Sequence, residues 1–80
     1  QVSRNIEDML EMLQQAGEIN SMHDFARRSG ISHASIGRVI RGERWINAEL
    51  LARLEYAGGY QLWGERAQKV SEPRFDVEHK

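Results

Sequence analysis

Basic side chains concentrate in the middle of the chain, and every one of them there is an arginine. Residues 21–53 carry six arginines against three acids, a net charge of +3; the six are Arg27, Arg28, Arg38, Arg41, Arg44 and Arg53. The planar fork of arginine makes paired hydrogen bonds with phosphate and with guanine. The segment therefore offers contact with a polyanion, and the alternative is a set of solvated helix faces.

The charge of the whole chain conceals this basic segment. The 80 residues have a net charge of −1 and a pI of about 6.3, which taken alone argues against nucleic acid. Residues 1–20, however, sum to −3 and residues 54–80 to −1.

Length and composition limit the class of protein. Eighty residues suit one small globular domain. The absence of cysteine excludes disulfides and thiol catalysis and favours a reducing, cytoplasmic setting. No apolar run approaches the roughly 20 residues that span a bilayer, so no membrane partner is expected. Because glutamine stands first, we expect an excised piece of a longer chain.

Apolar spacing predicts four helices in the first 59 residues. Three are expected at 5–16, 22–29 and 33–41, and a fourth runs from Asn47 to the pair Gly58-Gly59. The predicted N-caps are Asn5, Ser21, Ser32 and Asn47. Gly17, Gly30 and Gly42 are expected to end the first three helices.

The remaining 21 residues follow a weaker pattern. A short fifth helix over 60–70 would place Trp63, Ala67 and Val70 on one face. We expect residues 1–70 to form the domain. Residues 71–80 are expected to be a mobile tail unless Phe75 and Val77 dock.

Residues 22–42 have the spacing of two helices joined by a tight turn. Ala26 is small where the next helix crosses, and Gly30 permits a positive φ in the turn. From Asp24 to Gly42, and again over 46–54, the sequence resembles the lambda-repressor-like, Cro/Xre-type DNA-binding family. The resemblance covers about residues 5–57. It implies an all-α, four- to five-helix lambda-repressor-like domain with the helix-turn-helix at about 22–41.

The chain departs from that family at two positions. Family members often have a glutamine that contacts a phosphate where this chain has Met22, so that anchor is either absent or replaced by Ser21 or His23. Ser29 stands where a larger apolar residue is usual.

The resemblance also implies which side chains meet DNA, because the family's third helix enters the major groove. The predicted base-reading residues are Ser32, His33, Ala34, Gly37 and Arg38, with Gly37 facing outward so that the helix can approach closely. The alternative for Gly37 is that it accommodates a packing neighbour. The predicted phosphate contacts are Ser21, His23, Arg28, Arg41, Arg44 and Asn47. Trp45 is expected to cover the core as a lid, with a bond from its indole N–H to phosphate as the alternative.

These residues predict a sequence-specific DNA-binding transcriptional regulator of the phage or prophage repressor type. It would act on double-stranded operator DNA as a homodimer whose seam is Tyr60, Leu62 and Trp63, at the nucleoid of a bacterial or phage-infected cell. The alternative is an antitoxin- or inhibitor-type module that holds a protein partner through its C-terminal segment. An enzyme, a cofactor and a metal are not expected, because His23, His33 and His79 have no catalytic or metal-binding spacing.

Overall fold

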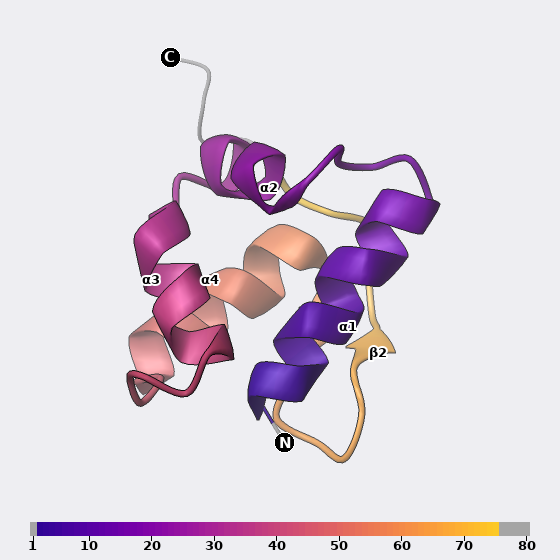
Figure 1. The fold of residues 1–80 in the computed structure, drawn as a ribbon. Helices are drawn as coiled ribbons and strands as arrows, with labels where there is room; N and C mark the ends of the chain where they lie inside the picture. The colour runs from indigo at the N-terminus through magenta and orange to yellow at the C-terminus, as the bar shows by residue number, and fades with distance from the viewer. Residues whose placement is uncertain (1, 76–80) are drawn as a thin grey trace.

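Four α-helices and a small β-hairpin make up the fold (Figure 1) of the computed structural model, which describes residues 2–75. The elements are α1 (Val2–Gln15), α2 (Met22–Ser29), α3 (His33–Ile40), α4 (Ala48–Gly58), β1 (Tyr60–Gln61) and β2 (Gln68–Lys69). The strands pair antiparallel, with Tyr60 opposite Lys69 and Gln61 opposite Gln68. The predicted all-α class with a helix-turn-helix is confirmed, whereas the predicted fifth helix over 60–70 is wrong.

Helices α2, α3 and α4 begin at the predicted caps. The side-chain oxygens of Ser21, Ser32 and Asn47 accept the backbone N–H three residues later, at 3.1, 3.3 and 2.7 Å. Each bond satisfies a donor that has no partner inside the helix. These three caps are confirmed.

Helix α1 differs from the prediction at its start. It begins at Val2, so Asn5 lies inside the helix and is not its N-cap. The Asn5 side chain is only 1% exposed, and its amide Nδ2 donates to the carbonyl oxygens of Leu62 (2.7 Å) and Gly64 (2.8 Å). Asn5 therefore ties α1 to the β-hairpin.

The hairpin forms because Gly59 ends α4 in the left-handed region, with φ of 76°. After it, buried Tyr60 and Leu62 alternate with the half-exposed Gln61, which is the period of a strand. The Glu55 carboxylate accepts the Leu62 N–H at 2.8 Å. Tyr60 and Leu62 are thereby directed into the core.

One hydrophobic core joins α1, the helix-turn-helix, α4 and the hairpin. Its fully buried large side chains are Ile6, Met9, Phe25, Ile36, Leu54 and Leu62. Among residues 2–75, no helix is long and apolar enough to cross a membrane.

The segment after β2 returns to α2 (Figure 1). The Arg74 N–H donates to the Ala57 carbonyl at 2.8 Å, and the Phe75 ring meets Phe25 edge-on with centroids 5.9 Å apart. For residues 71–75 the structure thus shows the stated alternative to a mobile tail, in which Phe75 docks. Val77 lies outside the described residues.

Candidate nucleic-acid interface

The turn between α2 and α3 is stabilised by hydrogen bonds between residues that are close in the sequence. Gly30 has a φ of 76°, and its N–H donates to the Ala26 carbonyl. The Ser29 hydroxyl is buried and accepts the Ile31 N–H at 3.2 Å. Ser29 thus serves the turn through its hydroxyl, which explains how a small polar residue fits there.

The outer face of α3 carries most of the predicted base-reading residues. Ser32, Ala34 and Arg38 are exposed, and His33 is half-buried. Gly37 is buried because the side chain of Arg41, itself more than half exposed, lies over it, with the guanidinium 2.9 Å from where a Cβ would stand. Glycine at this position makes room for that side chain.

Two histidines from different helices stack at this face. The rings of His23, in α2, and His33, the first residue of α3, lie 3.9 Å apart between centroids, with 13° between their planes. The stack limits how the His33 ring can turn at the start of α3. Within residues 2–75, no group of three or more histidines and acids is placed to hold a metal ion.

Asp24 engages both arginines of α2. Its carboxylate is buried and accepts the Asn20 N–H at 2.9 Å, the Arg28 Nε at 3.1 Å and a bond from Arg27. The Arg28 guanidinium also lies 5.9 Å from the Phe75 ring centroid. Arg28, predicted to contact phosphate, is thus bound within the domain.

These bonds make stability depend on pH. The hydrogen bond from the Asn20 N–H lowers the pKa of Asp24, and with the bond and charge of Arg28 it outweighs burial, which acts to raise that pKa. The carboxylate therefore stabilises the fold fully above its unfolded pKa of about 3.9, and this contribution is lost as pH falls through the lower folded pKa. Thermal unfolding should show wild type more stable than Asp24→Asn near neutral pH, with the difference closing in acid.

The matched control for this titration is Glu7→Gln, which changes an exposed acid on α1. Its difference from wild type should stay small at every pH. A gap between wild type and Asp24→Asn that does not vary with pH would contradict the role of the carboxylate charge.

Three arginines near the turn form no ion pair among the described residues: Arg38, Arg44 and Arg53. Arg44 donates to the Ser35 hydroxyl at 3.4 Å, and Arg53 to the Gly30 carbonyl at 3.5 Å. Both line a cavity of about 210 Å³ between the starts of α3 and α4, together with Ser32, Ser35, Asn47 and Glu49. The two guanidiniums outweigh the one carboxylate, so the cavity suits an anionic oxygen.

Arg53 and Ser35 were not predicted as site residues. Both face this cavity, yet Arg53 shares the exposed side of α4 with Ala52 and Tyr56. Helical spacing predicts which residues of a helix are exposed, but it does not predict which other element of the fold lies beside each exposed residue.

Arg41, which was predicted to contact phosphate, forms an ion pair with Glu43. Its Nε donates to the Glu43 carboxylate at 3.0 Å, and this bond and the arginine charge lower the pKa of Glu43. Both side chains are more than half exposed, so water screens the pair and a phosphate can compete for the guanidinium.

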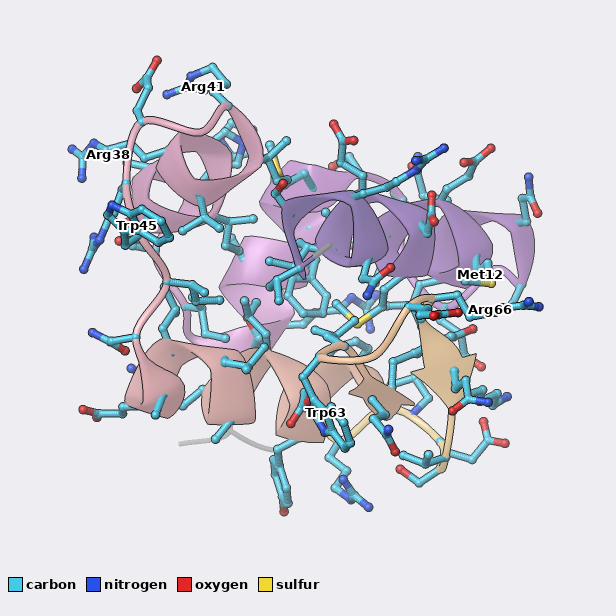
Figure 2. The ribbon with its side chains drawn as sticks, turned by 90° about the horizontal axis from the view of Figure 1, so that it is seen from below. Met12, Arg38, Arg41, Trp45, Trp63 and Arg66 are labelled. Carbon is cyan, nitrogen blue, oxygen red and sulfur yellow. The ribbon has the colours of Figure 1, made fainter. Side chains whose placement is uncertain are left out.

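Trp45 does not cover the core. Its side chain is 94% exposed, and the neighbouring Ile46 packs against the core instead. Arg38, Arg41 and Trp45 project from the same end of the molecule (Figure 2). The predicted lid is wrong.

The three residues of the predicted dimer seam differ in their exposure. Tyr60 and Leu62 belong to the core of the protomer, while Trp63 is 66% exposed. Trp63 lies well away from Trp45 (Figure 2). Tyr60 and Leu62 are unavailable to a second copy, because they are only 7% and 0% exposed.

Comparison with known proteins identifies the family. No curated protein matches the chain. No solved structure matches it. A family model described as helix-turn-helix matches residues 19–61, which is more than half of the chain and contains α2, α3 and α4. The chain therefore belongs to the Cro/Xre-type helix-turn-helix family of DNA-binding domains.

Proposed function

We propose that this chain is a sequence-specific regulator of transcription, of the phage-repressor type, which places α3 in the major groove of operator DNA. The observation that carries the proposal is the exposed side of α3, where Arg38 forms no ion pair with any of residues 2–75, and where Arg44 and Arg53 lie beside the start of α4. The acids of residues 1–20 belong mostly to α1. This division of charge orients the domain on a polyanion.

Within this proposal, the outer face of α3 reads the bases. Arg38 forks onto a guanine, and His33, held by His23, meets a base edge at the start of α3. Ser32 and Ala34 contact neighbouring base edges or a thymine methyl group.

The surrounding residues bind the backbone. Arg44 and Arg53 bind phosphate groups of the DNA. Arg41 binds one as well, when the phosphate displaces the Glu43 carboxylate from its guanidinium. The side-chain oxygens of Ser21 and Asn47 already accept the N–H groups of Asp24 and Leu50. Phosphate therefore binds the other N–H groups in the first turns of α2 and α4, and the Asn47 amide N–H₂ adds a further donor.

We further propose that the regulator acts as a homodimer on a two-fold operator. Exposed Trp63 supports this proposal as an apolar contact for a second copy. A dimer gains affinity because the second half-site contact becomes intramolecular.

A second candidate is a module that binds another protein. The exposure of Tyr56 and Val70, in addition to Trp63, favours it, because exposed aromatic and apolar side chains are typical of protein contacts. The DNA experiment below separates the two functions.

The test is binding to duplexes selected from a random library, measured by fluorescence anisotropy at several salt concentrations. If each protomer neutralises about three phosphates through Arg41, Arg44 and Arg53, log K should fall against log salt with a slope of about −3 per protomer. Two protomers should bind one two-fold duplex.

The control is Arg66→Ala, because Arg66 lies at the far end of the molecule from Arg38 (Figure 2). This variant should keep the wild-type slope. Failure to select any duplex, or binding that ignores salt, would instead support the protein-binding function.

A further inference from the structure

Trp45 is presented by a short loop that is fixed at both ends. At the α3 end, Gly42 has a φ of 77° and the Glu43 N–H donates to the Arg38 carbonyl at 2.8 Å. At the α4 end, Asn47 accepts the Leu50 N–H at 2.7 Å. These bonds fix the backbone on both sides of Trp45, and the loop presents the indole to solvent.

The surroundings of Trp45 combine positive charge with an apolar hollow. Arg44 is its neighbour in the loop, and Arg38 projects from the same end of the molecule (Figure 2). Beside the indole lies an open groove of about 510 Å³, to which Val2, Val39 and Ile46 contribute apolar side chains. A partner that suits this end of the molecule carries negative charge and also presents apolar faces.

DNA meets both requirements at one place. When a recognition helix lies in the major groove, the loop after it approaches the sugar-phosphate strand that separates the major groove from the minor groove. Phosphates on that strand attract the arginines, and deoxyribose and base edges in the minor groove accept apolar side chains that wedge into it.

We propose that Trp45 inserts its indole into the minor groove next to the half-site, and so selects DNA that can deform there. The proposal rests on the proposed function and adds a specificity element outside α3. A-tracts are stiff and have a narrow minor groove, whereas TA and CA/TG steps open and kink easily. The indole therefore disfavours A-tract flanks without reading any base directly.

The experiment compares two duplexes that share one selected half-site. One has an A-tract at the flank and the other has TA and CA/TG steps. Wild type should prefer the deformable flank by about tenfold. Trp45→Ala should lose that preference to within about twofold, by binding the deformable duplex less tightly, and Trp45→Phe, which keeps an aromatic wedge, should retain part of it.

A direct signal comes from 2-aminopurine placed in the flanking step. Wild type should raise its fluorescence, because insertion unstacks the base, and Trp45→Ala should not. Arg66→Ala should behave as wild type in both assays. Circular dichroism of Trp45→Ala should match wild type, because the indole contacts no core.

Equal binding of wild type to both flanks would overturn the proposal, and so would a flank preference that survives in Trp45→Ala. Either result leaves the proposed function standing, since the half-site is still bound. Failure of wild type to bind any duplex overturns the proposed function together with this inference.

Discussion

Arg38→Ala is expected to weaken binding to the preferred operator by about 1–3 kcal/mol and to remove discrimination at one base pair. Arg38 is exposed on the outer face of α3 and, among residues 2–75, forms no ion pair that would divert it. The variant should be titrated against a set of operators that each have one base pair changed. Each change should reduce the affinity of the variant as much as it reduces that of wild type, except at the base pair that Arg38 reads, where the variant should lose no affinity.

Arg44→Ala is the matched comparison, because it also removes one exposed guanidinium from the same face. It should weaken every operator alike and reduce the salt slope by about one, as expected for a phosphate contact. An equal loss on all operators from Arg38→Ala would show that Arg38 touches only the backbone.

Gly59→Ala is expected to destabilise the fold by about 3–5 kcal/mol. Gly59 has a φ of +76°, and an added Cβ would collide with the Ser71 carbonyl oxygen and lie 2.9 Å from that of Glu72. Those carbonyls belong to backbone that Gly59 itself holds, since its own carbonyl accepts the N–H groups of Val70 and Ser71. Chemical denaturation measures the loss.

Gly17→Ala separates the two causes. Gly17 has nearly the same φ, +78°, but nothing lies within 4 Å of its added Cβ. It should cost only the backbone strain, about 1–2 kcal/mol. Similar losses from the two substitutions would mean that the segment after β2 moves aside without cost.

The helix-turn-helix was predictable because its signals are local. Ser21, Ser32 and Asn47 cap helices through bonds that span three residues, and Gly30 supplies the one backbone conformation that the turn needs. Because both partners of such a bond lie within a few residues of each other, the residue types and their spacing in the sequence are enough to predict it.

The incorrect predictions concern residues whose conformation depends on a partner that is distant in the sequence. Asn5 suits an N-cap by its type, and its actual partners lie 57 and 59 residues away. Tyr60 and Leu62 fit a helix or a strand equally well, and the outcome depends on Gly59 and on the bond from Leu62 to Glu55. Trp45 resembles a core residue by composition, but its side chain is 94% exposed and the neighbouring Ile46 packs against the core instead.

The contact between Asn5 and the hairpin also orders the folding of the chain during its synthesis. Helices α2, α3 and α4 are complete by Gly58, yet Leu62, a fully buried side chain, and the carbonyls that Asn5 binds follow later. A nascent chain that stops at Gly58 contains α2, α3 and α4 but lacks the buried Leu62 side chain and both partners of Asn5. We therefore expect the domain to complete its core late in synthesis, when the segment after α4 reaches back to α1.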